Sequence, residues 1–521
     1  MSHILLIHPP SVFSRYSISA PVCMPLSIAY LAANLREHGH RVSVIDALGA
    51  GLDHIAVSYR RVALYRGLSN EAILDRITEK PDAIGVATMF SQEWPHFEAL
   101  INDLHAKFPD VPIIVGGEHA TAASEYILKS CPAVKYVARG EGEDIILDLA
   151  DFLDGKKRED EITGILYRSP DGSIVTNPDR PRNRTPDQFP WPAWDLFDLD
   201  PYFKVGEGHG VERGRSMPIV GTRGCPYQCS FCSNPQMWTT RYVMRSVTSV
   251  VDEIEHYIKT YRAENIDFFD LTAIIKRDWT LEFCREIQRR GLKFTWQLPS
   301  GTRSEAMDAE VLKAMAACGC RNLTYAPESG SEWTLKYIKK QVKLPRLLDS
   351  IRAAKREGIN VKCNLVIGFP QETRWDIIQT VWLAVKFGLM GVDDTGLYPF
   401  SPYPGSQLYA YLKGKGSIRP MDTEYFASLM SFMQFKPSAT FCENVGVWEL
   451  TFYRIVGMSL FYGLSYLLHP RRILRSIRNY RDHRSDTIFE ERFFGVIRRF
   501  KMVKRAPAAD RPKTERRAVH A

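Results

Sequence analysis

The run Gly221-Thr-Arg-Gly-Cys-Pro-Tyr-Gln-Cys-Ser-Phe-Cys232 places Cys225, Cys229 and Cys232 on one short loop, with three and then two residues between them. Thiolates are soft ligands that suit iron–sulfur clusters, so this loop can hold three irons of a cubane cluster. The fourth iron would then have no protein ligand and would be free to bind a substrate. The same logic distinguishes open, catalytic zinc sites from closed, structural ones.

Two other interpretations of the cysteines stay open. They could form a zinc site that lacks its fourth ligand, although no Cys or His follows at zinc-finger spacing. They could also be core thiols, since free cysteine is often buried. Core cysteines rarely gather in a loop bounded by Gly224 and Pro226, which favours the cluster.

Strand and helix patterns alternate on both sides of this loop, which predicts an α/β fold with parallel sheets. Before the loop we expect strands at Ile4–His8, Val42–Asp46, Ala83–Thr88, Ile113–Val115 and Tyr136–Ala138. The helices expected with them are Pro25–His38, Ser69–Glu79, Trp94–Phe108, Ala120–Lys129 and Glu143–Leu153. Around and after the loop we expect strands at Pro218–Thr222, Ile266–Asp270, Lys293–Leu298, Asn322–Ala326, Val361–Gly368 and Thr395–Pro399.

The cysteine spacing, with the aromatic Phe231 before the last cysteine, resembles the signature of the radical S-adenosylmethionine (radical SAM) enzymes. The six later strand–helix units resemble the partial (βα)6 barrel of that family, whose cluster loop follows the first strand at the carboxyl-end face. The resemblance implies a 4Fe-4S cluster on the three cysteines and cleavage of S-adenosylmethionine to a 5′-deoxyadenosyl radical. It also implies cofactor contacts after the fourth and fifth strands, at Glu328, Ser329, Gly330 and Gly368.

The first half resembles the cobalamin-binding domain that precedes many radical SAM domains, a doubly wound, flavodoxin- or Rossmann-like fold. Its matching segments are Pro25-Leu-Ser-Ile-Ala-Tyr-Leu-Ala, Val115-Gly-Gly-Glu-His-Ala and Gly140-Glu-Gly-Glu. Ligands of such sheets bind in loops beyond the carboxyl ends of the strands, where glycine permits close approach of the backbone. The loop residues expected at cobalamin are Pro9, Thr88, Gly116, Gly117, Gly140 and Glu141. The alternative is a flavodoxin-like domain that serves only as a docking platform.

This domain departs from the cobalamin domains that supply a histidine to cobalt. Their Asp-x-His-x-x-Gly motif is absent after the first strand, where the chain reads Leu6-Ile-His-Pro-Pro-Ser-Val-Phe. We therefore expect the lower face of cobalt to be open or weakly occupied. We expect His8 to make local hydrogen bonds at the strand end and His119 to lie in a loop near the corrin edge.

Other polar and thiol groups have two interpretations each. Asp270, after the second barrel strand, could contact the methionine amino group or cap local structure. Arg303 could reach a carboxylate or form a surface salt bridge. Cys318, Cys320 and Cys363 have no fourth cysteine at ligand-like spacing, so we expect buried structural thiols rather than a second cluster.

Composition is that of a globular protein, with 45% hydrophobic and 25% charged residues in 521. Ten cysteines do not make a disulfide scaffold in a chain of this size, and no signal peptide opens it, so we expect a cytoplasmic protein. From Arg471 onward there are 16 Lys and Arg against 6 Asp and Glu, whereas the chain as a whole carries +8. No aromatic-rich recognition motif accompanies this basic tail, so we expect no nucleic-acid partner.

The C-terminal region allows two interpretations. The uncharged run 455–468 has 14 residues, fewer than the ~20 that span a bilayer. The basic amphipathic segment Phe493–Arg505 could lie peripherally on the inner membrane face, or the region could be a helical cap with a solvated tail.

The sequence thus predicts a cobalamin-dependent radical SAM enzyme that methylates an unactivated carbon of an unknown organic substrate, with flavodoxin or ferredoxin as electron donor. One alternative is radical oxidative cyclisation or rearrangement of a tetrapyrrole-like or lipid substrate. Another is a non-enzymatic corrinoid-binding sensor or carrier. The expected parts are a cobalamin-binding domain (1–155), a connector with a hairpin and a proline-rich strap (156–214), a barrel (215–412), a helical region (413–505) and a disordered basic tail (506–521).

Overall fold

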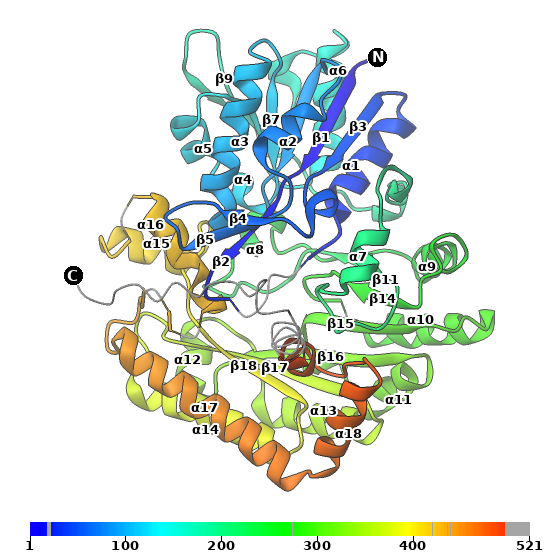
Figure 1. Ribbon diagram of the computed structural model, residues 1–521, viewed down its shortest axis with the longest axis vertical. Helices are drawn as coiled ribbons and strands as arrows, with labels where there is room; N and C mark the ends of the chain where they lie inside the picture. The colour runs from blue at the N-terminus through cyan, green and yellow to red at the C-terminus, as the bar shows by residue number, and fades with distance from the viewer. Residues whose placement is uncertain are drawn as a thin grey trace, which may run out of the picture.

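The computed structural model describes residues 1–17, 22–273, 275–418, 420–434, 436–437, 439–494 and 497. Two α/β units lie one above the other in Figure 1, and the N-terminal unit is at the top. Helical segments from the C-terminal part of the chain lie along the lower unit and between the two.

The N-terminal sheet has a parallel core that matches the five expected strands. They are β1 (His3–His8), β3 (Arg41–Asp46), β6 (Ala83–Ala87), β7 (Ile113–Gly116) and β8 (Val134–Ala138). Their order across the sheet is β3-β1-β6-β7-β8, so the second strand lies outside the first and the third on its other side. This is the doubly wound order in which ligands bind beyond the carboxyl ends of the strands.

Helices cover both faces of this sheet because residues of one strand point alternately to opposite sides. Ile4 and Leu6 of β1 pack in the core beneath α1 and α6, whereas Leu5 and Ile7 pack in the core beneath α3 and α5. The helices are α1 (Leu26–Glu37), α2 (Asn70–Asp75), α3 (Trp94–Lys107), α4 (Glu118–Ala122), α5 (Ser124–Ser130) and α6 (Gly142–Leu153). A small sheet of β2 (Ser11–Ser14), β5 (Ala63–Arg66) and β4 (Ile55–Val57) was not expected.

The connector joins the two units physically. Its hairpin, β9 (Ile165–Arg168) and β10 (Ile174–Thr176), adds two strands to the edge of the N-terminal sheet, which thus continues past residue 155. The proline-rich strap then touches both units. The Ala193 amide donates to the carbonyl of Ala29 in α1, and the Trp194 indole donates to the Tyr257 hydroxyl at 3.0 Å. A short helix, α7 (Asp200–Val205), leads to the barrel.

The second sheet consists of six parallel strands in chain order, as expected for an open barrel. They are β11 (Ser216–Ile219), β14 (Asn265–Phe268), β15 (Thr295–Thr302), β16 (Cys320–Glu328), β17 (Asn360–Ile367) and β18 (Asp394–Pro399). The helices between them are α9 (Val247–Tyr261), α10 (Arg277–Arg290), α11 (Ala309–Ala317), α12 (Glu332–Tyr337), α13 (Leu344–Arg356) and α14 (Arg374–Leu389). A two-stranded ribbon, β12 (Thr222–Arg223) and β13 (Val243–Met244), and α8 (Asn234–Trp238) flank the cysteine loop. The α/β fold class is confirmed.

The C-terminal region is helical, with α15 (Gln407–Gly414), α16 (Thr423–Ser428), α17 (Val447–Leu468) and α18 (Arg471–Arg481). Helix α17 packs along α14 and β18. Among the described residues, no helix is both long and apolar enough to cross a bilayer. Most of the expected membrane segment, 493–505, and all of 506–521 lie outside the described residues.

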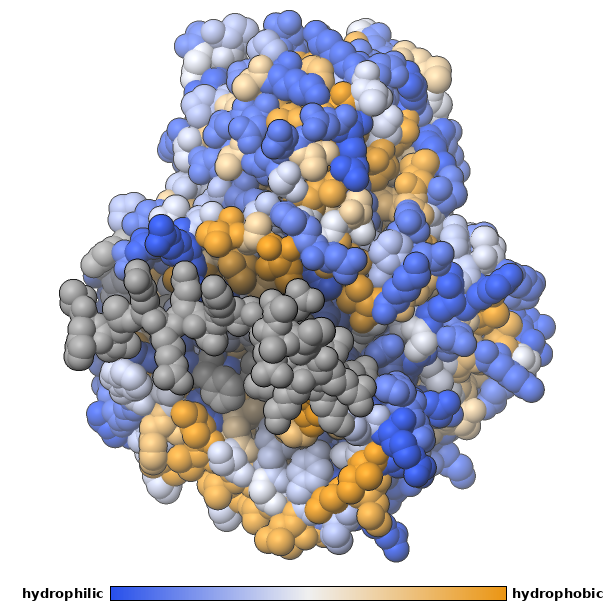
Figure 2. All heavy atoms as spheres, viewed as in Figure 1, coloured by the Kyte–Doolittle hydropathy of each residue, from blue (hydrophilic) through white to orange (hydrophobic). Residues whose placement is uncertain are grey.

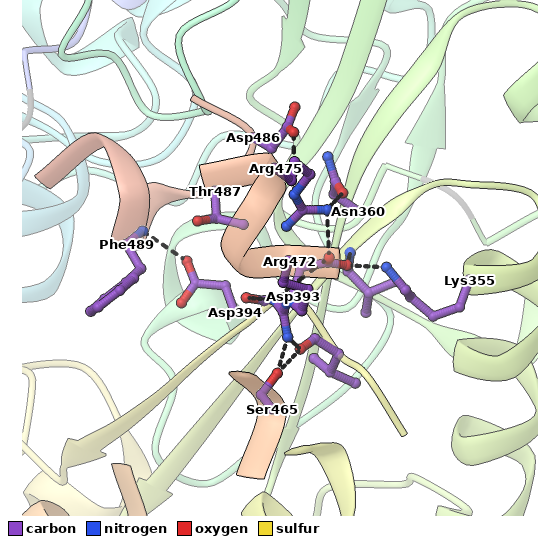
Figure 3. A network of polar contacts seen from close by, with 12 residues as sticks. Lys355, Asn360, Asp393, Asp394, Ser465, Arg472, Arg475, Asp486, Thr487 and Phe489 are labelled. Atoms are coloured by element: carbon purple, nitrogen blue, oxygen red, sulfur yellow. Dashed lines mark hydrogen bonds and ion pairs between the residues drawn. The ribbon is translucent and has the colours of Figure 1, made fainter. Parts of the chain in front are cut away.

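Helix α18 is fixed to the barrel by a buried ion network (Figure 3). Asp393, just before β18, is paired with Lys355 of α13 and with Arg472 and Arg475 of α18. Burial would raise the pKa of this carboxyl, but the three cations hold it below its ordinary value. Removing one member of such a network leaves buried charge without compensation.

Candidate functional site

The three cysteines lie where the sequence predicts, on the loop after β12 at the carboxyl end of β11. Two backbone hydrogen bonds attach the loop to the barrel: the Ser230 amide donates to the Ile338 carbonyl, and the Leu408 amide donates to the Ser230 carbonyl, both at 2.9 Å. Phe231 packs against Phe369 of the β17–α14 loop, with ring centroids 5.6 Å apart. The aromatic residue of the motif therefore anchors the loop in the core.

The thiols of Cys225, Cys229 and Cys232 are available to bind three separate irons of a cluster. All three are free and half-buried. Burial is the main cause that raises the pKa of Cys232 to about 12, and the charges of Glu118, Cys229 and Cys225 act in the same direction. Iron bound to the sulfurs would offset this cost, because a metal deprotonates the thiols that coordinate it.

The spacing of the thiols argues against the zinc alternative. In the described part of the chain, His40, Asp151 and Asp154 form the one set of three potential ligands whose atoms all lie within 4.8 Å of one another. The cysteine sulfurs are thus spread more widely than the ~3.8 Å between sulfurs on one tetrahedral zinc.

Two basic side chains lie beside the cysteine loop, Arg303 just after β15 and Lys340 just after α12. The Arg303 side chain is buried, and its guanidinium lies 3.6 Å from the centre of the Tyr227 ring. Its Nε also pairs with the partly exposed Glu305 carboxylate at 3.5 Å, so Arg303 does form a salt bridge. Lys340 donates to the Glu328 carboxylate at 2.8 Å, with both side chains 10% exposed or less. Burial raises the pKa of Cys229, while the charges of Lys340 and Arg303 act to lower it. The loop thus has an electropositive side that suits a carboxylate or an anionic cluster.

Lys340 was missed by the sequence analysis. It follows α12 in a polar stretch, and no local pattern marks it as buried. It reaches the site because α12 follows directly on the loop after β16.

Glu328 is held in a constrained position at the end of β16. Its φ of +70° is in the left-handed region that residues other than glycine rarely adopt. Such conformations persist where the surroundings impose them and often occur at functional sites. The Lys340 ammonium holds the Glu328 carboxylate in place by a hydrogen bond of 2.8 Å.

The two residues after Glu328 support the loop. The Ser329 hydroxyl is 2.8 Å from that of Thr380, and the Gly330 amide donates to the same Thr380 oxygen at 3.1 Å. A Cβ on Gly330 would lie 2.3 Å from the carbonyl oxygen of Gln379. Ser329 and Gly330 therefore pack the loop after β16 against α14.

Gly368 supports the next loop. Its φ is +85°, and its amide donates to a Glu372 carboxylate oxygen at 2.7 Å. A Cβ at this position would lie 2.9 Å from Leu450 of α17. The residue is therefore required by backbone conformation and by the close approach of α17.

The loops at the carboxyl edge of the N-terminal sheet form a surface with little side-chain bulk. Pro9 is buried after β1, and the Thr88 hydroxyl donates to the Gly116 carbonyl at 3.1 Å. A Cβ on Gly116 would meet the Ala138 Cβ at 3.7 Å, and one on Gly140 would meet the Met237 carbonyl oxygen at 3.8 Å, both ordinary contacts. A flat ligand can therefore approach the backbone here, which fits a corrin.

The two histidines expected near these loops, His8 and His119, each make a local side-chain contact. His8 Nδ1 is 2.8 Å from Asp46 Oδ1. His119 differs from expectation, because it lies on α4 rather than in a loop and is buried against Trp94 and Phe426. Burial lowers its pKa to about 3, and its Nδ1 is 2.9 Å from the Ser91 hydroxyl.

Glu141 lies between two arginines rather than open to a ligand. Its carboxylate is 2.8 Å from Arg182 of the strap and 3.2 Å from Arg223, and Arg223 also pairs with Glu143 at 2.5 Å. All four side chains are 10% exposed or less. Since Arg223 lies two residues before Cys225, this network ties the glycine-rich loop of the first unit to the cysteine loop of the second.

Two further contacts join the same loops. The Ser233 hydroxyl, next to Cys232, donates to the Glu118 carboxylate after β7. The Thr121 hydroxyl contacts the Met237 sulfur at 3.2 Å and accepts the Gly140 amide at 3.0 Å. The two carboxyl-end faces therefore meet across hydrogen bonds and ion pairs.

The remaining predicted groups have structural roles. Asp270 accepts the Gly221 amide at 3.1 Å and the Thr222 hydroxyl at 2.5 Å, which is the capping role. Cys318, Cys320 and Cys363 are buried, and the Cys318 sulfur lies 3.1 Å from that of Cys284 in α10. A cavity lined by His209, Gln297, Asn322, Lys362 and Asp394 lies at the amino-terminal ends of the barrel strands, on the opposite side from the cysteine loop.

Family comparisons agree with this arrangement. The B12 binding domain model matches residues 19–150, and the Radical SAM superfamily model matches residues 219–384. An uncharacterized methyltransferase of Pyrococcus horikoshii is 28% identical over 440 residues, which is 83% of this chain and 88% of that protein. The cytidylyl-2-hydroxyethylphosphonate methyltransferase of Streptomyces wedmorensis is 28% identical over 81% of this chain and 84% of its own length.

Two further matches extend the comparison. The anaerobic magnesium-protoporphyrin IX monomethyl ester cyclase of Rubrivivax gelatinosus is 27% identical over 84% of this chain and 74% of its own length. The radical S-adenosylmethionine methyltransferase TsrM from Kitasatospora setae, solved with tryptophan and an S-adenosylmethionine analogue, shares the fold with a TM-score of 0.60. Its sequence is 19% identical, and the match covers 80% of this chain and 77% of that one.

The two α/β units and the open three-cysteine loop define a radical SAM enzyme. More particularly, the chain belongs to the family of radical SAM enzymes that carry a B12-binding domain. Its cofactors are a 4Fe-4S cluster, S-adenosylmethionine and cobalamin, and the reaction needs a reductant and an organic substrate.

Proposed function

We propose that this enzyme is a cobalamin-dependent radical SAM methyltransferase that acts on an unactivated carbon. Cys225, Cys229 and Cys232 would hold the cluster, and the loops around Pro9, Thr88, Gly116, Gly117 and Gly140 would hold cobalamin. When bound, the cluster and S-adenosylmethionine supply a 5′-deoxyadenosyl radical, and methylcobalamin supplies the methyl group.

The contact between the two carboxyl-end faces carries this proposal. Arg223 bridges to Glu141 and Glu143, and Ser233 bonds to Glu118, so the cysteine loop and the glycine-rich loops are held against each other. A carbon radical must meet the methyl donor before it meets solvent, and side chains that clamp the two faces exclude water from the space between them. A docking platform alone would not need the glycine-lined edge to face the cysteine loop.

The basic residues at the loop have a binding role in this proposal. Arg303 and Lys340 offer donors to the carboxylate of S-adenosylmethionine. The Arg303 Nε is ion-paired with Glu305 at 3.5 Å but makes no hydrogen bond within the described structure. The Glu328 carboxylate, fixed by Lys340, offers an acceptor on the same side.

We further propose a reducing, cytoplasmic setting with flavodoxin or ferredoxin as the electron donor. All ten cysteines are free thiols, which a reducing compartment preserves. Peripheral contact of the basic segment 493–505 with the inner membrane face remains a prediction, because most of that segment lies outside the described residues.

Anaerobic reconstitution with methylcobalamin and methyl-labelled S-adenosylmethionine tests the reaction. Wild-type protein should bind about four irons and about one corrinoid per chain, release 5′-deoxyadenosine and label a product from cell extract. Joint replacement of Cys225, Cys229 and Cys232 by Ala should abolish iron binding and deoxyadenosine, whereas replacement of Cys318, Cys320 and Cys363 should spare the iron.

Other outcomes would favour one of the alternative interpretations. Deoxyadenosine without transfer of the label would favour oxidative cyclisation or rearrangement. Bound corrinoid without deoxyadenosine would favour a sensor or carrier. Loss of half the iron in the second triple variant would indicate a second cluster.

A further inference from the structure

Helix α17 is apolar on the side that faces away from the barrel. Its inner side packs on α14 and β18 through buried residues such as Gly457 and Phe461. Its outer side carries large apolar residues at helical spacing, each at least 43% exposed: Trp448, Phe452, Ile455, Leu460, Leu467 and Leu468. A helix that is apolar all round is normally buried on every side or lies in lipid.

The two charged residues of α17, Glu449 and Arg454, do not interrupt its outer apolar side. Glu449 is paired with Arg374 of α14 at 2.6 Å. Arg454 is half-buried and donates to the backbone carbonyl of Phe432 at 3.2 Å. Both charges are therefore compensated within the protein.

Neighbouring helices extend the exposed apolar surface. Helix α14 adds Trp375, Ile378, Trp382 and Leu389, which recur on one side of that helix, and α18 adds Ile473, Leu474 and Ile477. We refer to these residues, with the six of α17, as the apolar face. Figure 2 shows hydrophobic residues gathered along the lower rim of the molecule, where Figure 1 places α17 and α18. Exposed apolar surface of this extent marks an interaction site.

The orientation of α18 is fixed by the network in Figure 3. Arg472 and Arg475 point to Asp393, which turns Ile473, Leu474 and Ile477 outward. The remaining arginines of this stretch, Arg471, Arg478, Arg481 and Arg484, are exposed beside them. Helix α18 is thus a basic amphipathic helix in a fixed position, a pattern typical of helices that lie on anionic membranes.

We propose that the apolar face docks on the surface of an anionic lipid bilayer. Three exposed tryptophans, Trp375, Trp382 and Trp448, suit the boundary between headgroups and acyl chains. The exposed arginines of α18 complement negatively charged lipid. A second copy of this chain fits less well, because its apolar face has the same basic edge and does not supply the negative charge that these arginines would complement. The proposal concerns a binding surface and does not depend on methyl transfer.

Flotation with lipid vesicles tests the proposal on the full chain. Wild-type protein should bind vesicles of equal parts phosphatidylcholine and phosphatidylglycerol at low salt and bind more weakly at high salt. Phe452→Ser combined with Leu467→Ser should weaken binding at least about tenfold, since both side chains are exposed and lose apolar area. Arg478→Gln with Arg481→Gln should weaken binding to these vesicles and leave binding to pure phosphatidylcholine unchanged.

The matched control replaces exposed apolar residues elsewhere. Ile55→Ser with Val57→Ser alters β4, where the two side chains are 52% and 57% exposed, and should bind as wild type does. Equal binding by the Phe452/Leu467 variant and wild type would assign any attachment to the C-terminal tail and overturn the proposal. So would a concentration-dependent dimer in sedimentation that this variant abolishes, without vesicle binding by the wild type.

Discussion

At the scale of single residues, adjacent glycines after β7 have different requirements. Gly117 has a φ of +119°, and a Cβ there would lie 2.7 Å from the Thr88 carbonyl oxygen. At Gly116 the nearest atom to an added Cβ is the Ala138 Cβ at 3.7 Å, so alanine fits the protein itself. One position is thus constrained by the fold, whereas the other is free for close approach of a ligand.

The glycine pair gives a prediction about cobalamin. Gly116→Ala should leave the free energy of unfolding of the apoprotein nearly unchanged but weaken cobalamin binding, because its methyl group occupies the approach to the backbone. Gly117→Ala should destabilise the apoprotein by about 1–3 kcal/mol through backbone strain. Urea unfolding and equilibrium dialysis with cobalamin measure the two effects. Unchanged cobalamin affinity in Gly116→Ala would place the corrin elsewhere.

Glu372 gives a prediction about pH. Burial raises the pKa of its carboxyl from 4.5 to about 7, although the Phe369 and Gly368 amides act to lower it. The folded protein thus holds this proton more tightly than the unfolded chain. The protonated Glu372 carboxyl therefore adds to the free energy of unfolding. This contribution is complete below about pH 4.5 and is lost as the pH rises through about 7.

The variant Glu372→Gln isolates this effect, because the amide stays neutral and can still accept the two backbone N–H groups. Between about pH 5 and about pH 8, wild-type stability should fall by up to about 3 kcal/mol relative to the variant. Urea unfolding at both pH values is the measurement. Glu79, whose pKa is lowered by Arg41, serves as a control, since Glu79→Gln should not reproduce this trend. Parallel pH profiles for wild type and Glu372→Gln would contradict the assignment.

At the scale of elements, α18 depends on one carboxylate. Asp393→Asn would leave Lys355, Arg472 and Arg475 facing a neutral amide in a buried setting. We expect a loss of about 3–5 kcal/mol and earlier proteolysis within α18. Asp349→Asn is the matched control, because its pair with Arg352 lies on the surface and should matter little. Equal stability of the two variants would show that packing alone holds α18 in place.

At the scale of the whole molecule, the two α/β units should unfold as one. Arg223→Met would leave the Glu141 and Glu143 carboxylates without their shared cation, at a cost of about 3–5 kcal/mol. We expect the single urea transition of the wild type to separate into two, with the N-terminal unit followed by its own tryptophan, Trp94. Arg36→Met removes an exposed ion pair with Asp195, between the N-terminal unit and the strap, and should keep one transition. Two transitions already in the wild type would mean that the ion network does not couple the units.

Local sequence patterns are sufficient to predict the order of the elements and the ligand chemistry of the cysteine loop. Strand–helix alternation and the spacing of Cys225, Cys229 and Cys232 are local, because they depend on periodicity and on neighbours a few residues apart. Every strand expected in the two large sheets is present, with ends shifted by a few residues. The small sheet of β2, β4 and β5 was missed because its strands are short and because β2 pairs with β5 across about fifty residues.

Which distant residues meet depends on how the whole chain packs. Glu141 and Arg223 are 82 positions apart, and their pairing requires both units to be folded and docked. The burial of His119, the approach of Lys340 to the cysteine loop and the outward apolar side of α17 likewise depend on which surfaces pack together. Local patterns encode the period of a helix or strand, but which side of α17 is covered is settled by the energy of packing the whole chain.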